Sequence, residues 1–362
     1  MNLLLIGAGR ISGKHIEALI SNKDRISLMG VCDPVIERAG EKANEYAHSL
    51  GVNRPVPVYT DYKEALGLHP DVVSICTESG YHPQIAINCL EAGCHVIVEK
   101  PMALSTTDAE NMIEAAKMHN RKLAVSFQNR FNAPIQKLRT AYESSRFGGI
   151  LHSSIHIRWN RNAGYYTQAP WRGTWDLDGG TLMNQCTHGI DLLQWFNRPV
   201  KRVFAVTRRF QRPIEAEDFG TAILEFEDGS VGTIEGTANV YPQNLNETLA
   251  LFGSRGTAVV GGIAVNKIET WRFSDAEQVG DSEEYVLDLN AEDPSTVYGF
   301  GHSALYKDFI DAVEQDRTPL IDGREGKKSL DIILAVYKSM KTGRSVDLPL
   351  KFSTQEMRGL FS

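Results

Sequence analysis

The first third of the chain alternates short apolar runs with stretches of helical periodicity. The apolar runs, which are typical of buried strands, lie at 3–6, 26–33, 56–59, 71–77, 94–100 and 122–127. Between them, apolar residues recur every three or four positions, which predicts helices at 11–20, 35–50, 82–93 and 105–119. Strands that alternate with helices indicate right-handed crossovers and a parallel, doubly wound sheet.

Beyond about residue 125 the pattern changes to one dominated by strands. The segment 152–159 alternates in strand fashion, 219–238 predicts two strands around an Asp228-Gly229 turn, and 247–260 predicts another hairpin. Together these strands predict an open antiparallel sheet. Helical periodicity returns at about 181–196, 302–316 and 325–341.

Length, charge and cysteine usage narrow the class of protein. The chain has 362 residues, more than a usual single domain, so we divide it into residues 1–125 and 126–362. Its formal net charge of −7 argues against a general nucleic-acid binder. The five cysteines form no Cys-x-x-Cys pair, which favours a reduced cytoplasm. Cys186 and His188 lack a third ligand at convincing spacing, so we expect no metal site. No apolar run approaches the roughly 18 residues of a membrane span.

A glycine-rich turn, GAGRISG at 7–13, joins the first predicted strand to the first predicted helix. Gly7 and Gly9 permit a tight turn and the close approach of a pyrophosphate, to which the helix N-terminus offers free N–H groups. Ser12 occupies the third glycine position of the dinucleotide fingerprint, so the strict pattern is not met. The predicted cofactor-binding residues of this turn are Gly7, Gly9, Arg10 and Ile11.

Asp33 ends the second predicted strand, where an acidic residue accepts hydrogen bonds from the adenosine ribose of a dinucleotide. Its charge would repel a ribose 2′-phosphate, which favours NAD over NADP. Together with the flanking strand and helix, these features predict a dinucleotide-binding domain. The alternative is a glycine turn in a flavodoxin-like or nucleotide-sugar domain without redox chemistry.

Glu99-Lys100-Pro101 directly follows the fifth predicted strand. The carboxyl edge of such a sheet is where ligands bind in this architecture. A lysine there can polarise an oxygen or share a proton with a base. Pro101 restricts Lys100 to an extended backbone, which would aim its side chain. The alternative is an ordinary solvated lysine in a loop.

A second group of polar residues lies on the helix expected at 181–196. Asn184, His188 and Asp191 are spaced i, i+4 and i+7, which places them on one face, and Gln185 lies beside them. His188 can take a hydroxyl proton near neutral pH, because the ordinary pKa of histidine is about 6.5. The alternative is a structural histidine bonded to Asp191.

A third group is the segment 158–178, which carries three arginines and five aromatic residues in an expected loop. Arginines bind phosphates in a fork, and aromatic rings stack on bases or sugar faces. The composition therefore suits a nucleotide-sugar diphosphate, with Arg172 and Tyr166 as predicted substrate-binding residues. The alternative is a packing loop or an oligomer contact.

The glycine turn, EKP at 99–101, SFQNRF at 126–131 and the Asn-x-x-x-His pattern together resemble the glucose-fructose oxidoreductase/inositol dehydrogenase (Gfo/Idh/MocA) family. The resemblance covers nearly the whole chain. It implies an α/β fold, with an N-terminal Rossmann domain that binds NAD(P) and a C-terminal α/β domain with an open, mostly antiparallel sheet. It also implies hydride transfer from a carbon–hydroxyl group to nicotinamide, with Lys100 and His188 as catalytic residues. Positions that touch the cofactor in the family correspond to Thr77, Ser79, His82, Glu99 and Gln128.

One position departs from the pattern of the inositol dehydrogenases, which have Asp where this chain has Asn184. Asparagine cannot accept a proton as a base, so the base role falls on His188 with Lys100. Three segments are similar to the nucleotide-sugar branch of the family, at 165–175, 183–195 and 301–309. That branch includes 3-dehydrogenases of UDP-N-acetylglucosamine and its uronic acid, which serve surface polysaccharide synthesis.

The expected function is therefore NAD-dependent oxidation of a sugar C3 hydroxyl to a ketone. Asn184 and Gln185 would orient the hydroxyls, and the loop around Arg172 would hold the distal phosphate. The alternatives are a dehydrogenase of inositol or a free sugar, and a non-catalytic NAD(P)-binding regulatory protein. We expect a cytoplasmic homodimer or homotetramer, without a nucleic-acid or membrane partner.

Overall fold

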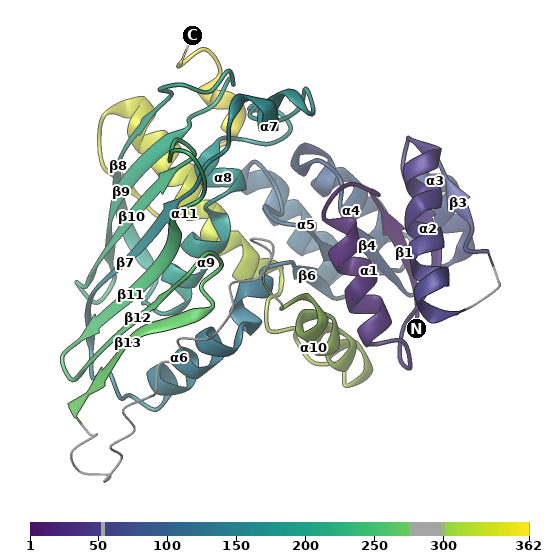
Figure 1. The fold of residues 1–362 in the computed structure, drawn as a ribbon, viewed down its shortest axis with the longest axis horizontal. Helices are drawn as coiled ribbons and strands as arrows, with labels where there is room; N and C mark the ends of the chain where they lie inside the picture. Colours follow the sequence, from purple (N-terminus) through teal and green to yellow (C-terminus); the bar gives the residue numbers. More distant parts are fainter. Residues whose placement is uncertain (52–54, 275–298, 300, 362) are drawn as a thin grey trace. The chain divides into compact units, whose positions relative to one another are not determined.

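The computed structural model describes residues 1–51, 55–274, 299 and 301–361 (Figure 1). The chain divides into two compact units, which are Met1–Phe127 with His302–Lys327 and Gln128–Gly301 with Lys328–Ser362. We call these the first and the second unit. The first unit thus gains a late segment that the expected division at residue 125 placed in the second domain. The reason is that α10 (His302–Glu314) packs against α1 (Ser12–Ser21).

The first unit is built on a six-stranded sheet in the order β3-β2-β1-β4-β5-β6, and all of its strand pairs are parallel. The strands are β1 (Asn2–Ile6), β2 (Ser27–Cys32), β3 (Val58–Tyr59), β4 (Val72–Ile75), β5 (His95–Val98) and β6 (Leu123–Val125). The order reverses between β1 and β4, and ligands of doubly wound sheets bind at such a switch point. The predicted parallel sheet is confirmed.

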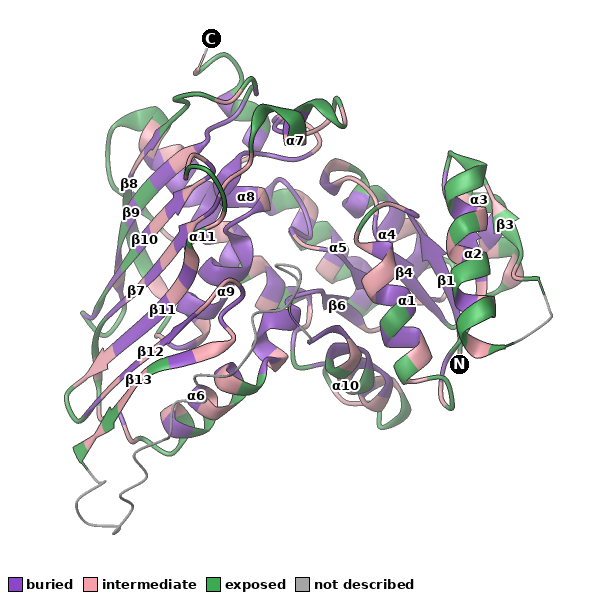
Figure 2. Cartoon of the chain, viewed as in Figure 1, coloured by how far each residue is buried: buried purple, intermediate pink, exposed green. Residues whose placement is uncertain are grey.

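Successive residues Leu3, Leu4 and Leu5 of β1 are all fully buried, which shows that both faces of this sheet are covered (Figure 2). Besides α1 and α10, the helices of this unit are α2 (Ile36–Leu50), α3 (Tyr62–Ala65), α4 (His82–Glu91) and α5 (Thr106–Met118). Ser105 caps α5, since its hydroxyl accepts the N–H of Asp108 at 3.0 Å. The four helices predicted from periodicity in this region are therefore present.

The second unit contains an eight-stranded sheet in the order β13-β12-β11-β7-β10-β9-β8-β14. Among the described strands only β7 and β10 pair in parallel, so the sheet is mostly antiparallel, as predicted. The strands are β7 (Ile150–Arg158), β8 (Val200–Arg208), β9 (Phe219–Phe226), β10 (Val231–Thr237), β11 (Asn246–Gly253), β12 (Gly256–Gly261), β13 (Lys267–Phe273) and β14 (Val346–Asp347).

Helices lie on one face of this second sheet. The helices that begin or end in the second unit are α6 (Ala133–Glu143), α7 (Ala163–Thr167), α8 (Thr181–Asn184), α9 (Thr187–Trp195) and α11 (Gly323–Thr342). Helix α8 packs on β9 and β10, and α9 packs on β7 and β11. Burial alternates along β9 and β10, so the opposite face is open. On that face Phe204 and Ile223 are neighbours in register, and both are exposed.

The helix expected over 181–196 is broken into α8 and α9, so that prediction is wrong. The N–H of Cys186 bonds to the carbonyl of Thr181, five residues earlier, at 3.0 Å, and the regular turn ends there. Asn184 and His188 consequently lie on different helices and not on one continuous helix.

Several other features of the described residues can be compared with the sequence prediction. Helix α7 lies inside the segment expected to be a loop, where Asn162 caps it. The elements α6, β8 and β13 were also missing from the sequence prediction. None of the five cysteines forms a disulfide, and all five are buried. No helix within the described ranges is long and apolar enough to cross a membrane.

Candidate functional site

The turn between β1 and α1 has a shape that requires glycine at its first position. Gly7 has a φ of +91°, and a Cβ there would lie 2.6 Å from the carbonyl carbon of Cys76. At Gly9, in contrast, no atom lies within 4 Å of the Cβ position. Ser12 begins α1, and its hydroxyl donates to the carbonyl of Gly9 at 2.6 Å. The turn therefore presents its backbone and a helix N-terminus to open space, which fits a pyrophosphate.

Asp33, just beyond β2, is bonded to the same turn. Its Oδ2 accepts the N–H of Ala8 at 2.8 Å, and its Oδ1 accepts the N–H of Val35 at 2.9 Å. The residue is buried, so its carboxylate is fixed where a dinucleotide fold places the adenosine ribose. Arg10 is exposed in the turn and Ile11 is half-buried. The structure thus brings together the predicted cofactor residues at the ends of β1 and β2.

The loops after β4 and β5 are joined through His82. Its Nε2 lies 3.1 Å from the carbonyl oxygen of Thr77, and its Nδ1 lies 2.8 Å from that of Pro101. Burial lowers the pKa of His82. Ser79 is buried at the start of the short helix Ser79–Tyr81, and Lys100 is half-buried before a cis peptide bond to Pro101. His82 therefore lies between carbonyls of the two loops that carry Thr77 and Lys100, and its neutral ring donates to one of them.

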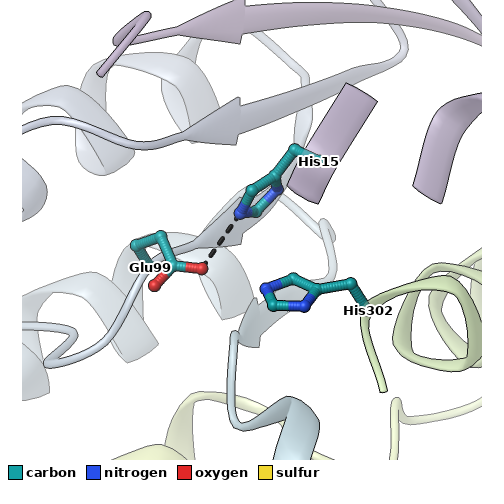
Figure 3. A group of neighbouring side chains, drawn as sticks. All are labelled: His15, Glu99 and His302. Atoms are coloured by element: carbon teal, nitrogen blue, oxygen red, sulfur yellow. Dashed lines mark hydrogen bonds and ion pairs between the residues drawn. The ribbon is translucent and has the colours of Figure 1, made fainter. Parts of the chain in front are cut away.

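Glu99, at the end of β5, forms a buried ion pair with His15 of α1 (Figure 3). The His15 Nε2 and the Glu99 Oε1 are 2.9 Å apart, and the His15 Nδ1 lies 2.8 Å from the hydroxyls of both Ser74 and Tyr306. Burial acts to lower the pKa of His15, but neighbouring groups, Cys76 and Tyr306 foremost, hold it well above 6.5. Burial acts to raise the pKa of Glu99, but its bond to His15 holds that pKa well below 4.5. Sequence reasoning singled out Glu99 and missed its partner.

His302, at the start of α10, lies beside this pair (Figure 3). One ligand atom each from His15, Glu99 and His302 lies within 4.8 Å of the others, a grouping compatible with a metal ion. The bond between His15 and Glu99 already uses two of those atoms, however. His302 has no hydrogen-bond partner within the described ranges, and burial, followed by the charge of His15, lowers its pKa to about 3. We therefore describe the cluster as an ion pair beside a neutral histidine.

In the second unit, His188 at the start of α9 lies next to Gln128. The Nε2 atoms of the two side chains are 3.4 Å apart, and both residues are buried. A general base requires a neutral imidazole with an unprotonated ring nitrogen. Sequence reasoning placed Gln128 near the cofactor and did not predict its contact with His188.

Asp191 of α9 binds Arg130 of the short helix Gln128–Phe131. The Arg130 Nε and Nη2 atoms each donate to one carboxylate oxygen of Asp191, both at 2.7 Å. Gln194 donates to the same carboxylate at 3.3 Å. A buried guanidinium thus engages both carboxylate oxygens of Asp191.

Asn184, at the end of α8, and Gln185 join the helix to the segment 158–178. The Asn184 amide donates to Asp178, and the Gln185 amide donates to the Asn184 Oδ1 at 3.1 Å. Gln185 also donates to the hydroxyl of Tyr165 at 3.3 Å. The two residues predicted to orient the substrate hydroxyls, Asn184 and Gln185, are thus bonded to each other.

Tyr165 is the centre of the aromatic and basic cluster that the sequence predicted. The Arg172 guanidinium donates to its hydroxyl and lies 4.2 Å from its ring centroid. Arg161 lies 5.3 Å from the same ring and 4.8 Å from that of Trp159. Tyr166, the predicted substrate residue, is instead buried. Sequence reasoning missed the central place of Tyr165, because the sequence gives no signal that distinguishes Tyr165 from the adjacent Tyr166.

Glu217 binds the backbone of α8 and was not singled out from the sequence. It is fully buried, its Oε1 accepts the N–H of Leu182 at 2.8 Å, and the Tyr337 hydroxyl donates to the same oxygen at 3.1 Å. Burial raises its pKa from 4.5 to about 8. A protonated carboxyl therefore holds the helix that carries Asn184.

Several curated proteins are similar over almost the full chain. The myo-inositol 2-dehydrogenase of Thermotoga maritima is 28% identical over 355 residues, which cover 96% of this chain and 98% of that protein. The D-glucoside 3-dehydrogenase of Escherichia coli is 24% identical and covers 96% of this chain and 97% of its own.

A solved structure with higher identity is that of the WlbA dehydrogenase from Bordetella pertussis in complex with NADH and UDP-GlcNAcA. It is 36% identical, covers 96% of this chain and 99% of its own, and superposes with a TM-score of 0.84. Family models match both parts of the sequence. An oxidoreductase family with an NAD-binding Rossmann fold matches residues 1–127, and the GFO/IDH/MocA C-terminal domain matches residues 135–259. The chain therefore belongs to the Gfo/Idh/MocA family of NAD-binding oxidoreductases.

Proposed function

We propose that this enzyme oxidises the C3 hydroxyl of a UDP-N-acetylhexosamine, or of its uronic acid, to a ketone in surface polysaccharide synthesis. NAD is the proposed hydride acceptor. Support comes from the WlbA dehydrogenase, which binds NADH and UDP-GlcNAcA and is 36% identical to this chain.

The observation that favours a nucleotide sugar over a free sugar is the pair of arginines on Tyr165. Arg161 and Arg172 lie 5.3 and 4.2 Å from its ring, and neither has a carboxylate partner within the described ranges. Two guanidinium groups gathered on one ring repel each other unless an anion lies between them. A diphosphate supplies that anion and accepts their forked hydrogen bonds, whereas a polyol does not.

The first unit has the features that a dinucleotide needs. Gly9 faces open space at the N-terminus of α1, where a pyrophosphate would bind, and the fixed carboxylate of Asp33 would accept the ribose hydroxyls. When bound, NAD supplies the acceptor for the hydride. The charge of Asp33 would disfavour the 2′-phosphate of NADP. Thr77, Ser79 and Glu99 would complete the cofactor site from the loops after β4 and β5.

The proposed catalytic and substrate-binding residues have different roles. His188 takes the proton from the sugar hydroxyl on an unprotonated ring nitrogen. Lys100 stabilises the alkoxide that develops as the hydride leaves C3. Asn184 and Gln185, which are bonded to each other, orient the neighbouring hydroxyls. Asn184 takes no proton, since an amide side chain is not a base at neutral pH.

The proposal is tested with the variants Lys100→Ala and His188→Ala and a UDP-GlcNAcA substrate. Each should lose about 10²- to 10⁴-fold in kcat, the usual contribution of acid–base catalysis. Lys351→Ala and His48→Ala are matched controls on exposed positions and should keep wild-type turnover. Near-wild-type turnover in both catalytic variants would contradict the proposal.

The second candidate is a dehydrogenase of inositol or a free sugar, which the 28% identical myo-inositol 2-dehydrogenase favours. This candidate would be supported if myo-inositol reduced NAD and no UDP-sugar did. A regulatory protein that binds NAD without turnover is the candidate from another class. It requires saturable NAD binding with no reduction by any sugar offered.

We also propose that the enzyme is a cytoplasmic homo-oligomer. Phe204 and Ile223, exposed side by side on the open face of the second sheet, are apolar groups that a second copy would cover. Light scattering of the wild type and of Phe204→Glu checks this, since the charge should shift the mass towards a monomer. An unchanged mass in the variant would contradict this choice of surface.

A further inference from the structure

A hollow of about 420 Å³ opens on the second unit, beside the arginine cluster. Its lining residues are Asn160, Pro242, Gln243, Asn244 and Ile263. Three of the five are amides, and none is charged. The hollow thus offers hydrogen-bond donors and acceptors together with apolar surface, and no ionic partner.

The hollow is bonded directly to Arg161. The Oδ1 of Asn244 accepts the N–H of Asn160 at 2.9 Å and the Nη1 of Arg161 at 3.1 Å. The same guanidinium lies 5.3 Å from the ring of Tyr165. Arg161 therefore stands between the amide-lined hollow on one side and Tyr165 on the other.

The series continues from Tyr165 to the helix that carries the proposed sugar-orienting residues. Its hydroxyl accepts from Arg172 and, at 3.3 Å, from Gln185. Gln185 donates in turn to Asn184. Within one unit, the chain thus lines up a neutral amide hollow, two arginines and a group of amides that would orient hydroxyls.

We propose that the hollow is the subsite for the uridine of the substrate, and that Arg161 acts with Arg172 on the diphosphate. This inference rests on the proposed function. A uracil edge presents one N–H donor between two carbonyl acceptors, and an amide side chain provides both complementary groups. The ribose hydroxyls pair with amides equally well. The order of neutral, cationic and neutral surfaces matches the order of nucleoside, diphosphate and sugar in the ligand.

Gln243 is the sharpest probe of this subsite. It is exposed, and its side chain forms no hydrogen bond within the described part of the chain, so its removal breaks no internal contact. Gln243→Ala should fold as the wild type does and lose only what it gives to a ligand. Gln355→Ala, which truncates an exposed glutamine elsewhere in the same unit, is the matched control.

The experiment is calorimetric titration of the full chain, saturated with NADH, with UDP and separately with inorganic pyrophosphate. Gln243→Ala should weaken UDP about tenfold, as the loss of one or two neutral hydrogen bonds predicts, and leave pyrophosphate unchanged. Arg161→Gln should weaken both ligands, by about tenfold or more, because it removes a charged contact to phosphate. Gln355→Ala should match the wild type with both ligands.

Wild-type UDP affinity in Gln243→Ala, or a wild type that does not bind UDP, would overturn the subsite. Failure of the proposed function gives a different result. In that case UDP binds and responds to Gln243→Ala as expected, but no UDP-sugar reduces NAD. If a UDP-sugar is oxidised while Gln243→Ala keeps full UDP affinity, the function stands and the subsite is wrong.

Discussion

The guanidinium of Arg130 holds the carboxylate of Asp191 in two bonds of 2.7 Å each, and both side chains are at most 1% exposed. Arg130 comes from the short helix that also carries Gln128, and Asp191 comes from α9, which also carries His188. The pair therefore fixes the two segments whose side chains meet at His188 Nε2. Arg130 also lies 4.8 Å from the centroid of the Trp195 ring, a cation–π contact.

Breaking this pair should be costly. Asp191→Asn leaves the Arg130 charge buried without a counter-charge, and we expect it to lower the free energy of unfolding by about 3–5 kcal/mol, as for other buried pairs. Urea unfolding followed by tryptophan fluorescence measures the loss. The control is Asp347→Asn, which removes the partner of Arg202 in a pair that is 45% and 67% exposed. That change should cost no more than about 1 kcal/mol, and equal costs would contradict the account.

Asp33 should determine the choice between NAD and NADP. Asp33→Asn removes the negative charge beside the ribose site, and we expect the ratio of kcat/KM for NADP over NAD to rise at least about tenfold. The substitution also weakens one bond to the glycine turn, because an amide offers a single acceptor to Ala8 and Val35. A looser turn would affect both cofactors alike, so the ratio isolates the charge. An unchanged ratio would show that Asp33 does not select the cofactor.

Glu217 should make stability depend on pH. Burial raises its pKa from 4.5 to about 8, so the folded chain keeps a proton that the unfolded chain releases. The contribution of Glu217 to the free energy of unfolding is therefore fully present below about pH 4.5. It falls as pH rises towards 8, by at most about 1.4 kcal/mol per pH unit. Glu217→Gln should remove this fall and exceed the wild type in melting temperature above pH 8.

The matched control for Glu217 is Glu91→Gln, on an exposed position, which should follow the wild-type pH profile. Melting temperatures between pH 5 and pH 9 provide the comparison. If Glu217→Gln and the wild type lose stability in parallel over this range, the buried carboxyl is not the source of the pH dependence.

Local patterns were sufficient to predict the parallel sheet of the first unit, but not the late segment His302–Lys327 that belongs to it. Apolar runs, the turn at Gly7 and the acidic residue Asp33 follow from rules that act over a few neighbouring residues, and the strand order agrees with them. The antiparallel second sheet was predicted for the same reason.

The details of the second unit depend on contacts that periodicity does not encode. The helical pattern of 181–196 has no interruption, yet the helix breaks where Cys186 packs so closely on Gly236 that a Cβ there would lie 2.6 Å from its sulfur. The partner of Asp191 is 61 residues away in sequence. Long-range packing of this kind explains why the prediction of one continuous helix was wrong.

The most direct test of the account is an assay for reduced nicotinamide with NAD and a panel of UDP-GlcNAcA, UDP-N-acetylglucosamine, UDP-glucose, myo-inositol and glucose. Because the arginines on Tyr165 have no carboxylate partner within the described ranges, we predict reduction with a UDP-N-acetyl sugar and none with the free sugars. Product analysis should then find the ketone at C3. Reduction by myo-inositol or glucose, with none by any UDP-sugar, would contradict the central claim and leave the arginine cluster a structural role.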